Sequence, residues 1–307
     1  MATDIHAHIP VLLEETIAAL AVKPGGRYVD GTFGRGGHSR EIAKRGGEVL
    51  GIDRDDEAVA AAGGMKVVKG RHGEIKEIAN ENGWNEADGV LLDLGVSSPQ
   101  LDDAGRGFSF LREGPLDMRM DRSQGMSAAD LVNGESAERL EEIFREFGEE
   151  PAARRIARGI AARRGFRTTT DLAGFVERLS PRRGARHPAT RVFQALRMAV
   201  NDEIGELERA LSGGLALLRP GGRIAVISFE SLTDRIVKKF FSAHAGKMVS
   251  LQQGGERWEG TQPRVRVVTR RAVTASENEM TRNPRSRSAR LRAAEKEQEA
   301  MQTCAET

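Results

Sequence analysis

A cluster of glycines, followed at a set distance by a carboxylate, is the first feature of this sequence that could do chemistry. Gly34, Gly36 and Gly37 have no Cβ, so the backbone can adopt positive φ there and a ligand can approach it closely. Asp53 follows Gly34 by 19 residues. A carboxylate at about this distance binds ribose hydroxyls in nucleotide-binding α/β folds. We therefore predict a nucleoside pocket made by the glycine loop and Asp53.

Two residues beside the glycines indicate which nucleoside ligand would fit. Ser39 stands where the dinucleotide fingerprint needs its third glycine. Asp30 precedes the loop and would repel a pyrophosphate, whereas a ligand with a cationic or zwitterionic end would suit it. Both features favour S-adenosylmethionine over NAD. The alternative is that the glycines only form a turn between a strand and a helix.

Further polar residues follow two other apolar runs. Asp93 ends the run at residues 89–92, and a carboxylate in that place is costly to bury unless it is used or paired. Ligands of open α/β sheets bind at the carboxyl edge, so Asp93 and the loop at residues 97–100 are predicted to lie in the site. The alternative is a helix cap or a turn. His72 is placed either to flank an adenine ring or to pack at the surface.

Alternating strand and helix patterns must position these residues. The predicted strands comprise residues 28–30, 48–53, 65–70, 89–94 and 224–229. This alternation predicts an α/β fold with a doubly wound, Rossmann-like sheet. Residues 248–251 and 264–268 are expected to form a closing antiparallel pair. Residues 276–307 are polar and charged, so we expect partial disorder there.

The alternation stops near residue 100, where helical patterns without strands begin. We predict a discontinuous α/β domain at residues 1–103 and 199–307, and an inserted, mostly helical domain at residues 104–198. Phe108 and Phe110 of the insert could stack on a nucleic-acid base, but packing in the core of the insert is the better explanation.

Arginine is concentrated in two parts of the chain. Residues 151–200 contain 12 arginines and no lysine, against Asp171 and Glu177 as the only acids. Residues 261–292 contain nine arginines and two glutamates. Because the planar guanidinium fork suits phosphate, these clusters predict a nucleic-acid partner. The alternative is an ordinary solvated surface in an arginine-rich proteome.

Composition excludes several classes of protein. The 307 residues suffice for about two domains. The single cysteine, Cys304, permits no internal disulfide and no cysteine-based zinc site, which is typical of a reducing compartment. No secretory signal and no run of about 18 apolar residues is evident. We therefore expect a cytoplasmic protein without a membrane partner or a metal.

Longer motifs occur in order along nearly the whole chain. They lie at residues 8–14, 30–39, 91–102, 106–110, 114–121, 187–197, 200–203, 220–223, 234–238 and 283–285. In these motifs the chain resembles the ribosomal RNA small subunit methyltransferase H family, whose members N4-methylate a cytidine in the decoding region of 16S rRNA. Two of these motifs, DGTFGRGGHS and LLDLGVSSPQLD, are far more specific than a glycine loop alone.

The resemblance implies an S-adenosylmethionine-dependent rRNA (cytosine-N4-)methyltransferase that acts on 16S rRNA or the small ribosomal subunit. It implies that the two-part α/β domain binds the cofactor and that the arginine-rich insert recognises RNA. Whether the protein forms a homodimer stays an open question. The cofactor-binding positions of the family map onto Gly36, Gly37, His38, Asp53, His72, Asp93 and Gln100. Asp93 is also the predicted catalytic residue, as acceptor of an N–H of the target amine.

Two positions depart from the family pattern. His72 replaces a phenylalanine, and an imidazole can still stack on adenine. Glu230 replaces a histidine, which exchanges a potential cation for an anion. Glu230 keeps open the alternative of a non-catalytic ribosome-assembly protein. A Rossmann oxidoreductase is disfavoured by the missing third glycine.

Overall fold

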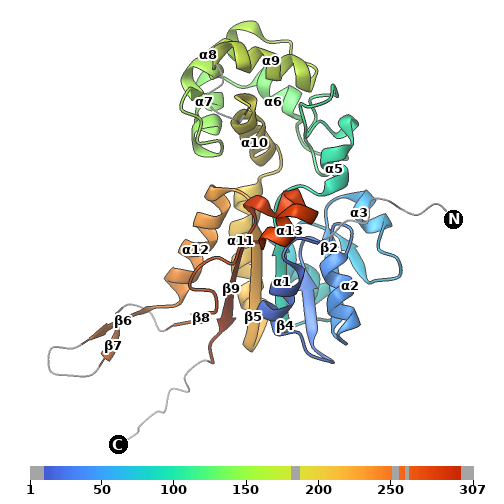
Figure 1. The fold of residues 1–307 in the computed structure, drawn as a ribbon, viewed down its shortest axis with the longest axis vertical. Coiled ribbons are helices and arrows are strands. Elements are labelled where there is room, and N and C mark those ends of the chain that lie inside the picture. The colour runs from blue at the N-terminus through green and yellow to red at the C-terminus, as the bar shows by residue number, and fades with distance from the viewer. Residues whose placement is uncertain (1–9, 181–186, 251–255, 260–262, 299–307) are drawn as a thin grey trace, which may run out of the picture. The chain divides into compact units, whose positions relative to one another are not determined.

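The protein divides into two compact units. The computed structural model describes residues 10–180, 187–250, 256–259 and 263–298. The first unit comprises Met1–Gly95 and Glu206–Thr307, and the second comprises Val96–Gly205. The second unit therefore begins at Val96, where we expected residue 104, and ends at Gly205, where we expected residue 198. The backbone of both units is shown in Figure 1.

A seven-stranded sheet is the centre of the first unit, with the strand order β3-β2-β1-β4-β5-β9-β8 (Figure 1). The strands are β1 (Arg27–Asp30), β2 (Glu48–Asp53), β3 (Val67–Lys69), β4 (Ala87–Asp93), β5 (Leu218–Ser228), β8 (Val265–Val267) and β9 (Arg290–Lys296). The first five strands of this order pair in parallel, whereas β9 is antiparallel to both β5 and β8. The doubly wound sheet is confirmed, and its strand order reverses between β1 and β4.

The last part of the chain differs from two of our expectations. Residues 277–296 are ordered as α13 (Glu277–Arg282), the 3₁₀ turn η3 (Pro284–Ser288) and β9, so the expected disorder is wrong there. The expected antiparallel pair is wrong as well, because β6 (Lys247–Ser250) pairs with β7 (Glu256–Glu259) and β8 pairs with β9. Leu251 and Cys304 lie outside the described residues.

Ion pairs explain how so polar a segment enters the sheet. The guanidinium groups of Arg290 and Arg292 both contact Asp234, and Glu295 accepts hydrogen bonds from Arg223 and Arg266. The side chains between these charges are small or apolar and are buried. Polarity along the sequence is therefore compatible with a strand here, because each charge has a partner on a neighbouring element.

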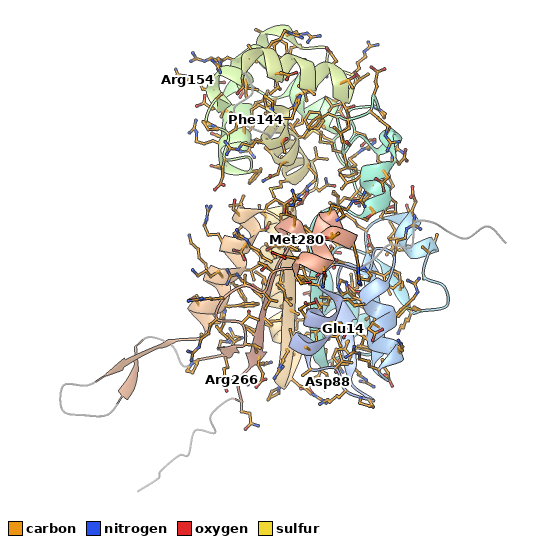
Figure 2. All side chains as sticks on the ribbon, in the orientation of Figure 1. Glu14, Asp88, Phe144, Arg154, Arg266 and Met280 are labelled. Atoms are coloured by element: carbon orange, nitrogen blue, oxygen red, sulfur yellow. The ribbon has the colours of Figure 1, made fainter. Side chains whose placement is uncertain are left out.

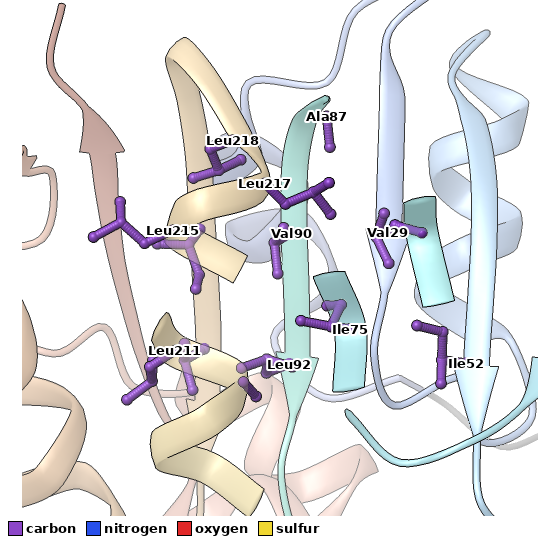
Figure 3. Packing of buried hydrophobic residues seen from close by; sticks show 14 of the residues in the cluster. Val29, Ile52, Ile75, Ala87, Val90, Leu92, Leu211, Leu215, Leu217 and Leu218 are labelled. Atoms are coloured by element: carbon purple, nitrogen blue, oxygen red, sulfur yellow. The ribbon is translucent and has the colours of Figure 1, made fainter. Parts of the chain in front are cut away.

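Apolar side chains that alternate along the strands pack on both faces of the sheet. Val90 and Leu92 of β4 point into one apolar cluster, which also contains Ile75 and Leu211 from helices (Figure 3). Leu91, between them, belongs to a separate cluster on the other face, with Ile17 and Ile42. Because successive side chains of a strand point to opposite faces, helices must cover both faces of this parallel sheet.

The helices of the first unit follow the strands. They are α1 (Leu13–Leu20), α2 (Gly37–Lys44), α3 (Asp56–Ala60), α4 (Ile75–Glu81), α11 (Glu203–Leu217), α12 (Ser231–His244) and α13, with the 3₁₀ turn η1 (His72–Glu74). α11 begins within the second unit. Residues of α4, α11 and α12 join the cluster around Val90, and residues of α1 and α2 join the cluster around Leu91. Nowhere in the described ranges does a helix combine the length and the apolar character needed to cross a membrane.

The second unit is helical and has a core of its own. Its elements are α5 (Ser98–Asp102), η2 (Ala104–Arg106), α6 (Ala128–Gly134), α7 (Ala137–Glu146), α8 (Ala153–Arg163), α9 (Thr169–Leu179) and α10 (Ala189–Val200). Phe144, Ile156 and Phe166 are among its fully buried side chains. Phe108 lies in this core, and Phe110 packs against it with ring contacts to His187 and Phe193. Core packing is thus their role in the fold.

Candidate cofactor and catalytic site

The glycine loop and the end of β2 meet directly. The Gly34 N–H donates a hydrogen bond to Asp53 Oδ2 at 2.8 Å, and the Asp55 N–H donates to Asp53 Oδ1 at 2.9 Å. Gly34 and Gly36 have φ of 53° and 68°, in the left-handed region that favours glycine. The structure therefore brings together the two features that the sequence predicts as a nucleoside pocket.

Two of the glycines are also required by contacts inside the fold. A Cβ on Gly36 would lie 2.5 Å from Cζ of Phe33, and one on Gly37 would lie 2.3 Å from Cγ of Pro10. Gly36 is the residue before α2, and no side chain caps this helix end with a hydrogen bond. The amino end of α2 is therefore approached closely by the Phe33 and Pro10 rings and lies at the glycine loop, where an anionic or polar ligand group would be favoured.

Three polar residues tie the carboxyl ends of β1 and β4 together. Asp30, which is 2% exposed, accepts hydrogen bonds from Ser39 Oγ at 2.6 Å and from the Thr32 N–H at 3.1 Å. Thr32 Oγ1 accepts the Asp93 N–H at 2.6 Å. Burial raises the pKa of Asp30 even though Ser39 and Thr32 act to lower it. These contacts lie where the strand order reverses, which is the usual ligand crevice of an open α/β sheet.

Asp93 carries the least satisfied carboxylate of this cluster. Its Oδ1 is buried and accepts no hydrogen bond from the described part of the chain. Its Oδ2 lies 3.7 Å from Nδ1 of His38, and 23% of the side chain is exposed. Burial raises the pKa of Asp93 to about 6; His38 acts to lower it and Asp30 to raise it further. A buried acceptor atom of this kind is suited to an N–H donor or a cation from a ligand.

Asp53 has a similar electrostatic environment but a different hydrogen-bonding state. Burial raises its pKa to about 6, although the N–H groups of Asp55 and Gly34 act to lower it. Both of its oxygens already accept a backbone hydrogen bond. Each carboxylate oxygen has a second lone pair, so the ribose hydroxyls predicted to bind here remain compatible with these contacts.

His38, His72 and Gln100 have separate surroundings. His38 is 5% exposed and its Nε2 lies 3.0 Å from the Val11 carbonyl oxygen. His72 lies against the end of β1, since a Cβ on Gly31 would be 3.3 Å from its own Cβ. Gln100 belongs to the second unit, where it forms the capping box of α5 with Ser97. Its contact with a cofactor stays a prediction.

The sequence analysis identified Asp30 but did not predict the contacts of Thr32, Ser39 and Val11, which shape this site. The Asp30-Gly-Thr32 segment contains a detectable signal, because an Asp that bonds the N–H two residues later is a common turn former. In the sequence Ser39 is only a departure from the glycine fingerprint, whereas in the structure its hydroxyl donates to Asp30. The contact between Val11 and His38 joins residues 27 positions apart, and no local pattern predicts it.

The structure separates the arginines into paired and exposed ones. Arg154, Arg155 and Arg158 of α8 are exposed, and within the described ranges they form no ion pair; Arg154 is labelled in Figure 2. In the second cluster, by contrast, Arg266 contacts Glu295, while Arg290 and Arg292 contact Asp234. The exposed arginines of α8 thus keep charge available for a polyanion. Other arginines are used within the fold, namely part of the second cluster and also Arg163 and Arg197 of the first, which pair with Asp171 and Glu203.

A cavity of about 220 Å³ lies in the second unit. Its lining includes Leu131, Ile143 and Met198, together with Glu135 and Arg139. None of the predicted site residues lines it. The cavity is therefore distinct from the polar cluster at the edge of the sheet.

Comparison with known proteins agrees with these observations. The sequence profile of the MraW methylase family matches residues 5–297. Three relatives carry the name ribosomal RNA small subunit methyltransferase H. The one from Methylobacterium nodulans is 51% identical, with 94% of this chain and 90% of the relative aligned. The one from Nitratidesulfovibrio vulgaris is 50% identical, with 94% of this chain and 95% of the relative aligned. The one from Dehalococcoides mccartyi is 46% identical, with 95% of this chain and 87% of the relative aligned.

Proposed function

The chain belongs to the MraW methylase family, and on that premise we propose that it transfers a methyl group from S-adenosylmethionine to N4 of a cytidine in the decoding region of 16S rRNA. The observation that carries the proposal is Asp93 Oδ1, a buried oxygen without a hydrogen-bond donor in the described structure, at the edge of the sheet where the strand order reverses. Family membership also makes a Rossmann oxidoreductase untenable.

The residues around the glycine loop fit S-adenosylmethionine. Asp53, the last residue of β2, would bind the ribose, and His72, the first residue of η1 after β3, would flank the adenine. Asp30 and Asp93 supply negative charge near the loop, which suits a sulfonium and an amino-acid end better than a pyrophosphate. When bound, S-adenosylmethionine supplies an electrophilic methyl group. We also propose that Gly36, Gly37 and His38, at the start of α2, and Gln100 contact the cofactor.

Asp93 would orient and deprotonate the target amine. The lone pair of the exocyclic amine of cytosine is delocalised into the ring, so the amine is a weak nucleophile. A carboxylate that accepts one N–H turns the amine toward the methyl carbon and stabilises the positive charge that develops on nitrogen. Alignment for in-line attack contributes several kcal/mol. Asp93 is therefore the proposed catalytic residue, and its partly exposed side chain leaves room for contact with the base.

An rRNA substrate also implies a role for the second unit. A cytidine must leave its stack to reach a pocket at the edge of a sheet. The exposed arginines of α8 would bind the phosphates of the surrounding rRNA, and such binding depends strongly on salt. A 16S rRNA substrate also places the enzyme in the cytoplasm.

A single assay tests the proposed function. Small ribosomal subunits that lack the modification are incubated with the protein and labelled S-adenosylmethionine, and the modified base is mapped by mass spectrometry of nuclease fragments. We expect one labelled cytidine, methylated at N4, in the decoding region. Asp93→Asn should lower the single-turnover rate by roughly 100-fold or more, as is typical when an acid–base group is lost.

Other results of this assay would contradict the proposal. Label on another base, or on carbon 5 of the cytosine, would exclude N4 transfer. Binding to the subunit without any transfer would favour the non-catalytic alternative. Glu230 bears on that alternative: it is the N-cap residue of α12, and its carbonyl accepts hydrogen bonds from Thr233 Oγ1 and the Asp234 N–H. Its backbone thus has a structural role whichever side chain it carries.

A further inference from the structure

His38 is buried between the segment before α1 and the carboxylate at the end of β4. Its Nε2 lies 3.0 Å from the Val11 carbonyl oxygen, and its Nδ1 lies 3.7 Å from Asp93 Oδ2. A carbonyl oxygen can only accept, so Nε2 must carry hydrogen in this contact. In the neutral imidazole Nδ1 is then the basic nitrogen, and it faces Asp93. The backbone of Val11 thus sets the tautomer of His38.

The backbone around Val11 is itself held in place. The Leu12 N–H donates to Glu279 Oε1 of α13 at 2.8 Å, and Leu12 has a φ of 53°. A non-glycine residue in the left-handed region is uncommon and needs support from its surroundings. Pro10 is in contact with Gly37, directly before His38. Residues 10–12 therefore form a fixed support on which the orientation of the imidazole depends.

We propose that His38 and Asp93 act as a proton-sharing pair, in which Asp93 takes the proton released by the target amine and His38 Nδ1 then receives it. This inference rests on the proposed function. His38 is a positioning residue in this scheme, because it acts on the substrate only through Asp93. The role goes beyond the cofactor contact that the family resemblance implies for this position.

The proton of the amine moves in two steps, after the methyl group has been transferred. The N4 lone pair forms the new carbon–nitrogen bond while the carbon–sulfur bond breaks and leaves its electron pair on sulfur. The nitrogen now carries a positive charge, which it loses when an N–H proton passes to the Asp93 carboxylate. The proton then moves to His38 Nδ1, which restores the carboxylate beside an imidazolium, and it reaches solvent after the product leaves. No oxidant or metal is needed.

The charges around the pair favour this sequence of steps. The titratable groups that act on Asp93 are His38 from α2 and Asp30 from β1; a protonated His38 lowers the pKa of Asp93, whereas an ionised Asp30 raises it. Asp30 is held by Ser39 and Thr32 and lies in the same buried cluster. The distance of 3.7 Å exceeds a hydrogen bond, but catalytic contacts are often long without substrate and shorten in the complex. Two interacting groups of this kind titrate as a pair.

Two substitutions separate the proton-sharing role from a purely structural one. His38→Gln keeps a donor that can reach the Val11 carbonyl but has no basic nitrogen facing Asp93. His38→Asn is too short to reach Val11 and also lacks a basic nitrogen. A structural role alone therefore predicts that His38→Gln behaves like the wild type and only His38→Asn is impaired. Proton sharing predicts that both are impaired.

The decisive measurement is the pH dependence of the single-turnover rate at saturating S-adenosylmethionine. We expect His38→Gln to reduce the rate by roughly tenfold or more near pH 7, because Asp93 has no neighbouring base to pass the proton to. The midpoint of the profile should move upward by about one pH unit, because in the wild type an imidazole that has bound a proton at lower pH favours the Asp93 carboxylate. A wild-type rate and an unchanged midpoint in His38→Gln would overturn the proposal.

A second readout does not depend on turnover. The ¹³Cγ resonance of Asp93 is followed as a function of pH in the cofactor-free protein, with Asp93→Asn used to assign it. His38→Gln should raise the Asp93 midpoint by about one pH unit. An unchanged midpoint would show that the two groups do not interact. If the wild type failed to methylate rRNA, the proposed function would fail, whereas this titration would still decide whether the pair exists.

Discussion

At the scale of single residues, the site contains buried carboxylates that the fold itself does not fully satisfy. Burial raises the pKa of Asp93 to about 6 and that of Asp53 to about 6. Asp53 accepts two backbone hydrogen bonds, whereas Asp93 Oδ1 accepts none within the described ranges. A charged group held in this way costs stability, and such costs are common where a site is prepared for a ligand.

Asp93→Asn should therefore change how stability depends on pH. The folded-state pKa of Asp93 lies above its ordinary value of 3.8. Its favourable contribution to the free energy of unfolding is therefore fully present below pH 3.8 and is lost as the pH rises through about 6. Relative to the wild type, the variant should gain roughly 1–3 kcal/mol between pH 4 and pH 7. Urea unfolding of both proteins at several pH values measures this difference. Parallel stability profiles would contradict the expectation.

At the scale of elements, one buried carboxylate connects α11 to the loops after β2 and β3. Glu206 is 1% exposed; it accepts the Gly73 N–H at 2.9 Å and an Arg209 hydrogen bond at 2.7 Å. Arg71 and Arg54 approach it to 3.5 Å and 3.9 Å. Burial acts to raise the pKa of Glu206, but Arg209, the Gly73 N–H, His72 and Arg54 together hold it below its usual range.

Glu206→Gln should consequently loosen the loops that follow β2 and β3. We expect a loss of stability at the lower end of about 3–5 kcal/mol, because Arg71 and Arg209 are partly exposed and can be solvated. Affinity for S-adenosylhomocysteine should fall as well, since Arg54 follows Asp53 and Gly73 follows His72. Thermal unfolding and calorimetry measure the two effects. Glu208→Gln, on an exposed position of the same helix, is the control and should be near neutral.

At the scale of the whole molecule, the two units for which we propose catalysis and rRNA binding have separate cores. The clusters around Val90 and Leu91 contain only residues of the first unit, and the cluster around Phe144 contains only residues of the second. The exposed arginines of α8 lie on the second unit, while Asp93 and Asp53 lie on the first. Each function can therefore be altered without direct damage to the core that supports the other.

Substitution of Arg154 and Arg158 by alanine should weaken rRNA binding without a change in cofactor affinity. If each contacts a phosphate, the slope of log affinity against log salt should become shallower by about 1–2. The matched control is the alanine double variant of Arg139 and Arg145, which are also exposed in this unit but pair with Glu142 and Glu141. Filter binding across a salt series compares them. Equal effects of both double variants on rRNA affinity would contradict a contact between α8 and the rRNA.

The sequence by itself determined the parts of the site that depend on short-range patterns. Residues 48–53 form β2 as predicted, Asp93 ends β4, and the glycine loop lies between β1 and α2. Strand periodicity, positive-φ glycines and the parallel order of strands suffice for these features, because each depends on neighbours in the sequence and on a common edge of the sheet.

Only the tertiary structure decided which partners the polar groups have. β9 enters the sheet because Asp234, Arg223 and Arg266 neutralise its charges, and nothing within residues 290–296 reveals those partners. The tautomer of His38 depends on a carbonyl 27 residues away, and the anchoring of Gly73 depends on Glu206, 133 residues away. Hydrogen bonds and ion pairs join whichever groups the packed helices and strands bring within about 3 Å, so they follow from the fold and not from local sequence.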